Sequence, residues 1–112
     1  MDFDSNLVKG STAPIVLRLL QERPMYGYEI VKLVNQRTGG RLEWREGSLY
    51  PCLHRLEGQG YLHARWEAAP SGKRRKYYHI TPKGEAELAH RVREWREFSA
   101  SLNVLLLGTT GP

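Results

Sequence analysis

The chain has 112 residues, of which 40% are hydrophobic and 26% charged, a composition that fits one globular domain with a modest core. No apolar run is long enough to cross a membrane, and a single cysteine supplies neither an intramolecular disulfide nor a CxxC zinc site. The N-terminal sequence MDFDSNLVKG is acidic and lacks the apolar segment of a secretory signal, so we expect a cytoplasmic protein.

The net charge of +5 is concentrated in the middle of the chain. Between residues 41 and 83 there are nine basic and four acidic side chains, whereas the remaining residues carry eight of each sign. The whole positive excess therefore belongs to one segment, which indicates a polyanionic partner more strongly than a uniformly basic chain would. We expect that partner to be double-stranded DNA.

The sequence before Pro24 predicts one helix, most of it core. Residues 1–10 are expected to form a lead-in, and Ser11 or Thr12 has the side chain of an N-cap. Pro14 then falls in the first turn, where its missing N–H costs little. Apolar residues follow at helical spacing, and we expect the helix to end before Pro24 because the residue preceding a proline disfavours the helical conformation.

A second helix is expected from about Tyr28 to Arg37, with one apolar side and a stop at Gly39-Gly40. Leu42 to Trp44 is a candidate short strand, and Trp44 is assigned to packing. A third helix follows after a tight bend. In a helix-turn-helix the earlier helix supports and the later one enters the DNA groove, so the third helix is the candidate recognition helix.

The third helix lies within Gly47 to Gly60, GSLYPCLHRLEGQG. Spacings of three and four predict one buried stripe, made of Leu49, Cys52, Leu53 and Leu56. The opposite face is free of acids and consists of Ser48, Tyr50, Pro51, His54, Arg55 and Gln59. This face suits the major groove of DNA, although taken alone an ordinary solvated face fits it equally well. We expect Ser48 to cap the helix and Pro51 to lie in its first turn.

A β-hairpin is predicted after this helix, because Tyr61 to Glu67 and Lys76 to Thr81 alternate in polarity. Pro70, Ser71 and Gly72 mark the bend between them. A hairpin that follows a helix-turn-helix is expected to form a wing.

The wing carries four consecutive bases: Lys73, Arg74, Arg75 and Lys76. Charge runs are more often solvated loops. On a protruding hairpin beside a recognition helix, however, such bases can reach phosphates or a narrow minor groove. We expect all four to bind DNA together with Tyr77, and we assign the phenol of Tyr50 to DNA as well.

No constellation of side chains predicts catalysis or a metal site. Cys52 and His54 point to different sides of their helix, and Cys52 is expected in the core, with redox sensing left open. His63 faces His79 if paired residue numbers sum to 142, but a third ligand is lacking, so we expect a satisfied or solvated pair. Neither a phosphate-binding glycine loop nor a nucleophile elbow is present. We therefore expect no cofactor, no metal and no enzymatic activity.

The C-terminal helix is expected to begin at Thr81-Pro82, run to Leu107 and stop at Gly108. Its apolar positions recur with heptad spacing and form a seam of Leu88, Val92, Trp95, Ser99, Leu102 and Leu106, which Phe98 and Leu105 widen. One small domain cannot cover so long a helix, and we expect a second copy of the chain to cover the seam. The alternative is that the seam folds back onto its own domain.

Several segments, in this order and spacing, resemble the PadR family of bacterial transcriptional regulators over roughly Val8 to Glu87. They are Pro24-Met25-Tyr26-Gly27-Tyr28-Glu29-Ile30, Gly47 to Glu57, Gly60-Tyr61-Leu62, Lys76-Tyr77-Tyr78 and Thr81-Pro82-Lys83-Gly84. The resemblance implies a winged helix-turn-helix domain, a dimerisation helix, and repression relieved by a ligand or stress signal. Two residues depart from the family pattern: Tyr26 stands where histidine is frequent, and Cys52 where an aliphatic residue is usual.

The resemblance also implies a ligand site. Some PadR-like proteins bind flat, apolar or cationic compounds between their subunits through an aromatic residue on the C-terminal helix, and Trp95 resembles that residue. Two symmetry-related indoles can enclose a planar ring or a cation. Val92, Phe98, Leu17 and Tyr28 are the other candidate lining residues. The alternative is that Trp95 only fills the dimer seam.

These expectations define an α+β fold, mostly α. A winged helix-turn-helix domain spans residues 1–81, with the wing at about 61–81; a dimerisation helix spans 82–107 and a disordered tail 108–112. The expected function is that of a ligand-responsive homodimeric repressor of a palindromic operator. Two rivals remain: a winged-helix module that binds another protein without reading DNA, and a small enzyme.

Overall fold

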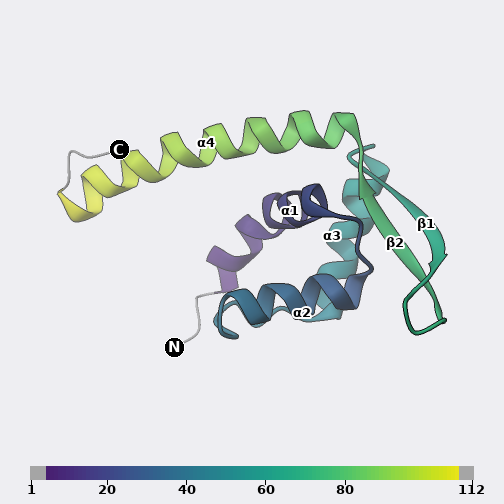
Figure 1. The fold of residues 1–112 in the computed structure, drawn as a ribbon. Coiled ribbons are helices and arrows are strands. Elements are labelled where there is room, and N and C mark those ends of the chain that lie inside the picture. Colours follow the sequence, from purple (N-terminus) through teal and green to yellow (C-terminus); the bar gives the residue numbers. More distant parts are fainter. Residues whose placement is uncertain (1–4, 109–112) are drawn as a thin grey trace.

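The computed structural model describes residues 5–108, and of residues 5–9 only the backbone. In chain order the elements are α1 (Ser5–Glu22), α2 (Gly27–Arg37), α3 (Glu46–Gly58), β1 (Leu62–Ala68), β2 (Arg74–Ile80) and α4 (Pro82–Leu107). Figure 1 shows α1, α2 and α3 gathered in one body, with the hairpin at its side and α4 reaching far beyond it. In the described part of the chain, no helix has the length and hydropathy to cross a bilayer.

The core forms where the three first helices turn their apolar stripes toward one another. The stripe predicted for α3 is buried in full, and α1 supplies Val16, Leu17, Leu19 and Leu20. The hairpin adds Leu62 and Tyr78, and α4 adds Leu88. Trp44 also packs into this core, as predicted. The apolar pattern therefore predicted correctly which face of each helix is inward.

The predicted start of α1 is wrong. The helix begins at Ser5, so Ser11 and Thr12 are interior residues and Pro14 lies inside the helix. An interior proline removes one backbone hydrogen bond, here to the carbonyl of Gly10, but it does not have to end a helix that packs well on both sides. The lead-in expected up to residue 10 is therefore helical from residue 5, and its first four residues lie outside the described part.

The predicted N-cap of α3 is wrong by three residues. Arg45 is extended and serves as N-cap, and its carbonyl accepts from the N–H groups of Ser48 and Leu49 at 3.2 and 3.1 Å. Ser48 is thus inside the helix and Pro51 lies beyond the first turn. The acid Glu46 at the first helical position favours this start, because the N-terminal end of a helix dipole is positive. The helical phase, and with it the outer face, is unchanged.

The short strand predicted at Leu42 to Trp44 is absent, because the backbone groups of Trp44 form hydrogen bonds with a side chain and not with another strand. The side-chain amide of Asn35 on α2 donates to the Trp44 carbonyl and accepts from the Trp44 N–H, both at 3.0 Å. Glu43, one residue earlier, has a φ of 48°. The side chain of Asn35 therefore satisfies the backbone groups that a strand would have paired, and a turn forms in place of the strand.

The hairpin has the register that places His63 opposite His79, as predicted. The strands extend further toward the tip than expected, because β2 starts at Arg74 and the turn closes with an Ala69 N–H donating to the Lys73 carbonyl at 2.8 Å. Met25 and Tyr78 also exchange backbone hydrogen bonds of 3.3 and 2.8 Å. The wing is thus fastened to the segment between α1 and α2.

The start of α4 agrees with the prediction. Thr81 is the N-cap, its hydroxyl accepts from the Gly84 N–H at 3.0 Å, and Pro82 follows. Gly108 ends the helix with a φ of 68°, and the tail predicted beyond it, residues 109–112, lies outside the described residues. Only the first part of the helix meets the body: Leu88 is 3% exposed, whereas Leu106 is 74% exposed.

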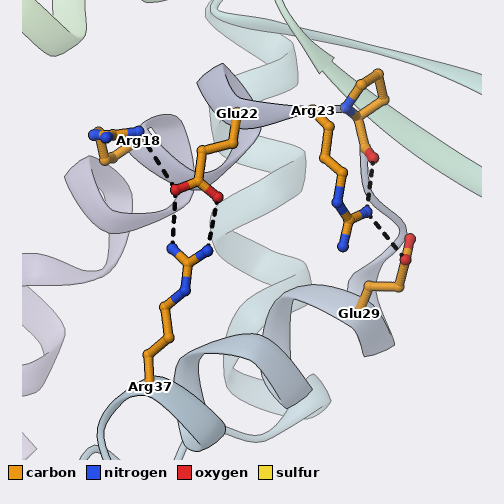
Figure 2. Close-up of polar contacts among 6 residues, drawn as sticks. Arg18, Glu22, Arg23, Glu29 and Arg37 are labelled. Atoms are coloured by element: carbon orange, nitrogen blue, oxygen red, sulfur yellow. Dashed lines mark hydrogen bonds and ion pairs between the residues drawn. The ribbon is translucent and has the colours of Figure 1, made fainter.

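An ion network joins α1 to α2, as Figure 2 shows. The two terminal guanidinium nitrogens of Arg37, Nη1 and Nη2, each donate to an oxygen of the Glu22 carboxylate at 2.9 Å. Arg18 approaches the same carboxylate at 3.7 Å. Hydrogen bonding to Arg37 holds the pKa of Glu22 below its ordinary value. The paired, ionised carboxylate fixes the end of α1 against the end of α2.

Candidate nucleic-acid interface

The predicted reading face of α3 is exposed along its whole length. Its members are Ser48, Tyr50, Pro51, His54, Arg55 and Gln59, and the residue after the helix end, Gln59, continues the face. Hydroxyl, imidazole, guanidinium and amide groups therefore meet solvent on one side of a helix whose other side is core. This arrangement can present hydrogen-bonding groups to base edges in a major groove.

Tyr50 has a second contact that its sequence position did not suggest. Its ring lies against Gly27 at the start of α2, where a Cβ built on the glycine would come within 2.7 Å of the phenol oxygen. The side chain is 37% exposed, and burial raises the pKa of the phenol, with the charge of Glu46 acting in the same direction. Tyr50 therefore holds α3 against α2 as well as facing outward.

The four bases of the wing do not share one environment. Lys73 is exposed in the turn. Arg74 is also exposed and donates to the backbone carbonyl of Trp66 at 3.2 Å. Lys76 lies 3.7 Å from the carboxylate of Glu57 on α3. The tip of the wing therefore has exposed cations, Lys73, Arg74 and the neighbouring Arg75, whereas Lys76 is linked to the recognition helix.

Arg75 and Tyr77 lie on the other side of β2, against Tyr26. The guanidinium carbon of Arg75 lies 5.4 Å from the centre of the Tyr26 ring. The rings of Tyr26 and Tyr77 meet edge to face at 5.4 Å and 82°. Burial raises the pKa of the Tyr77 phenol, and the charge of Glu29 adds to this effect. Both residues were predicted to face DNA, but each has a packing contact within the protein.

Trp66 is a surface residue that the sequence pattern missed. Alternation places it on the same side of β1 as Leu62 and Ala64, but its side chain is 62% exposed whereas Leu62 is buried. It pairs across the hairpin with Lys76 and lies next to Arg74. The distal position of Trp66 in the hairpin was the available signal, because wing residues near the tip have no core beneath them.

The paired histidines and the cysteine show no sign of reactive chemistry. The rings of His63 and His79 stack 4.7 Å apart at 6°, and Nε2 of His79 lies 3.1 Å from the Glu67 carboxylate. Among residues 5–108, no group of three potential ligands could hold a metal ion. Cys52 is buried, and burial raises the pKa of its thiol, which favours the less reactive protonated form.

A cleft of about 350 Å³ lies between α1 and α4, and it contains two of the predicted ligand-binding residues, Val92 and Trp95. The other apolar walls come from Pro14, Ile15 and Leu19 of α1 and from Leu88. Of the other three candidates, Leu17 is fully buried in the core, while Tyr28 and Phe98 are exposed outside the cleft lining. The fold therefore brings together only part of the predicted ligand set.

The fold has three helices, of which the third is a recognition helix with an acid-free outer face, and a basic hairpin lies beside it. These features define a winged helix-turn-helix DNA-binding protein. The family described as Transcriptional regulator PadR-like family matches residues 16–90, which is more than half of the chain. The chain belongs to this PadR-like family of transcriptional regulators, which is a regulatory and not an enzymatic family.

Solved structures agree with this assignment. A transcriptional regulator from Clostridium thermocellum is 32% identical, with a TM-score of 0.84 over 93% of this chain and 98% of that one. A PadR-like transcriptional regulator from Bacillus cereus is 32% identical, with a TM-score of 0.81 over 93% and 99% of the two chains. An uncharacterized protein from Lysinibacillus sphaericus is 35% identical over 104 residues, which are 93% of this chain and 95% of that protein.

Proposed function

We propose that this protein is a cytoplasmic, homodimeric, ligand-responsive repressor that binds a palindromic operator. The observation that carries the proposal is the unequal covering of α4, whose first part packs on the body while its second part is exposed and apolar. A second copy of the chain is the simplest cover for that surface. Two-fold pairing also repeats the recognition helix, which matches a palindromic site with two half-sites.

In the proposed complex, α3 of each protomer enters a major groove. Ser48, His54 and Arg55 are the residues that contact bases or nearby phosphates, with Tyr50 at their side. Lys73 and Arg74 reach the flanking phosphates from the tip of the wing. The rival function, a module that binds only another protein, predicts no retardation of random DNA at low salt in a gel-shift experiment.

Replacing Arg74 by alanine is expected to weaken DNA binding for all sequences alike and to lower its salt dependence. Each lost phosphate contact reduces the slope of log K against log salt by about 0.9, so the substitution, which acts once in each protomer, reduces it by about 1.8. Fluorescence anisotropy of labelled duplex DNA, measured over a series of salt concentrations, gives this slope. Arg93→Ala, an exposed arginine on α4, is the matched control and keeps the wild-type slope. An unchanged slope in Arg74→Ala contradicts the role of the wing tip.

The effector site is proposed at Trp95, whose side chain is 62% exposed at the edge of the cleft between α1 and α4. Pairing of two protomers along α4 brings a second Trp95 to the same seam. A planar aromatic or cationic compound bound there changes the angle between the two α4 helices, and so the spacing of the two recognition helices.

Titration with planar aromatic cations and with phenolic acids is expected to quench tryptophan fluorescence in a saturable manner. The quenching is lost in Trp95→Ala, because the indole that stacks on the ligand is removed. Trp66→Phe is the control: it removes an equally exposed tryptophan on the wing and keeps the quenching. Equal quenching of wild type and Trp95→Ala places the ligand elsewhere and contradicts this site.

A further inference from the structure

The segment between α1 and α2 holds the backbone of Tyr26 in a fixed position. On one side, Met25 exchanges two backbone hydrogen bonds with Tyr78 of the wing. On the other, the Tyr26 N–H donates to the carboxylate of Glu29 in the first turn of α2, at 3.2 Å. The guanidinium of Arg23 donates to the same carboxylate, with 3.2 Å between Nη1 and Oε2, as Figure 2 shows. The residue therefore stands where the wing and α2 come together.

The ring of Tyr26 meets two side chains of the wing. Tyr77 contacts it edge to face, and the guanidinium of Arg75 lies over it, each at 5.4 Å from the ring centre. Arg75 and Tyr77 are two apart in β2, so they project from the same side of the hairpin. Edge-to-face ring contacts and cations over aromatic rings are both attractive. One side chain of the helical body is thus in contact with two neighbouring positions of the wing.

This contact divides the basic run into two sets. Arg74 and Lys76 project from one side of β2. There Arg74 donates to the Trp66 carbonyl, and Lys76 lies near the carboxylate of Glu57 on α3. Arg75 projects from the opposite side, and its charge is engaged by the Tyr26 ring. Adjacent bases in the sequence therefore have different partners, because successive side chains of a strand alternate between its faces.

We propose that Tyr26 is a positioning residue that sets the wing relative to the recognition helix, and that Arg75 serves this contact in place of binding a phosphate. The inference rests on the proposed DNA contact of the wing tip. Tyr26 touches no nucleic acid; it acts by holding β2, so that Lys73 and Arg74 stand at the distance from α3 that the DNA backbone requires.

The experiment compares Tyr26→Ala, Tyr26→Phe, Arg75→Ala and Arg74→Ala, with the double variants of Tyr26→Ala and each arginine. Tyr26→Ala is expected to weaken DNA binding by about fivefold, the effect of losing one cation–ring contact, whereas Tyr26→Phe keeps the ring and binds as wild type does. Arg75→Ala is expected to cause a similar loss and to have the same salt slope as Tyr26→Ala, which removes no charge. Tyr26→Ala/Arg75→Ala is no weaker than either single variant, whereas the losses of Tyr26→Ala and Arg74→Ala add only in part, because Tyr26 then positions only Lys73.

Limited trypsin digestion provides a readout that does not depend on DNA. The run Lys73 to Lys76 offers cleavage sites, and Tyr26→Ala is expected to be cut there several-fold faster than wild type or Tyr26→Phe, which have the same sites. The inference is overturned by a salt slope that is lower in Arg75→Ala than in Tyr26→Ala, by additive losses in Tyr26→Ala/Arg75→Ala, or by unchanged cleavage of Tyr26→Ala. If Arg74→Ala leaves the slope unchanged, the proposed wing contact fails, and the cleavage rates alone decide whether Tyr26 holds the wing.

Discussion

Gly84→Ala is expected to lower the midpoint of thermal unfolding by about 5–20 °C, because forcing an extra carbon into a packed site typically costs about 1–3 kcal/mol. A Cβ on Gly84 would overlap the carbonyl oxygen of Tyr61 and come within 2.8 Å of Cγ1 of Ile80. The same carbonyl accepts the Thr81 N–H at 3.0 Å, so it cannot move without breaking the junction. Circular dichroism melting at one fixed protein concentration measures the change.

Gly58→Ala is the matched control. Gly58 is the last residue of α3, and nothing lies within 4 Å of a Cβ built there. Alanine has the higher helix propensity, so the midpoint is expected to stay the same or rise slightly. Equal melting of the two variants would contradict the close approach at Gly84.

The structure gives a physical reason for two of the sequence motifs that resemble the PadR family. The turn after α3 contacts the start of α4. The Thr81 hydroxyl donates to the Gly60 carbonyl at 2.7 Å, and the Lys83 ammonium donates to the Gln59 carbonyl at 2.8 Å. Gly84 allows this approach because it lacks a side chain. The resemblance identified both motifs, but their contact across more than twenty residues was not visible from the local pattern.

Helical phase was predictable from the sequence, whereas the starts of α1 and α3 were not. The stripe from Leu49 to Leu56 depends on a repeat over many residues, so it is insensitive to one misread signal. A start depends on one capping residue, and Ser48 has the preferred side chain while Arg45, which does not, takes the position. Pro14 was misread for the same reason. Tertiary packing of the whole helix outweighs a local preference of about 1 kcal/mol.

The composition of the candidate interface was predictable, and its internal contacts were not. The charge distribution and the acid-free face of α3 follow from residue types alone. That Tyr50 covers Gly27, or that Arg75 lies on Tyr26, depends on how distant segments pack, and no local pattern contains this information. A side chain that is predicted to face DNA can therefore also have a partner within the protein, and the sequence did not reveal that partner.

Leu102→Glu is expected to turn the proposed dimer into a monomer at micromolar concentration and to reduce operator affinity by about 100-fold or more. Burial of a leucine side chain contributes about 1.5–3 kcal/mol, and two-fold symmetry makes one substitution act twice in the interface. In the substituted protein, two carboxylates would also meet in an apolar seam. Sedimentation measures the association state, and anisotropy with a palindromic and a half-site duplex measures the affinity.

The expected loss of operator affinity in Leu102→Glu is large because operator binding by a dimer depends on two linked recognition helices. Once they are separated, each binds its half-site alone, and the gain in effective concentration disappears. Ser101→Glu adds the same charge one residue away, at an exposed heptad position on the outer side of the helix, and is expected to remain dimeric. Far-ultraviolet circular dichroism should stay near wild type in both, since glutamate favours helix and neither substituted residue belongs to the core. A dimeric Leu102→Glu with unchanged affinity would show that the exposed end of α4 is not the interface, and that a different surface brings the two recognition helices together.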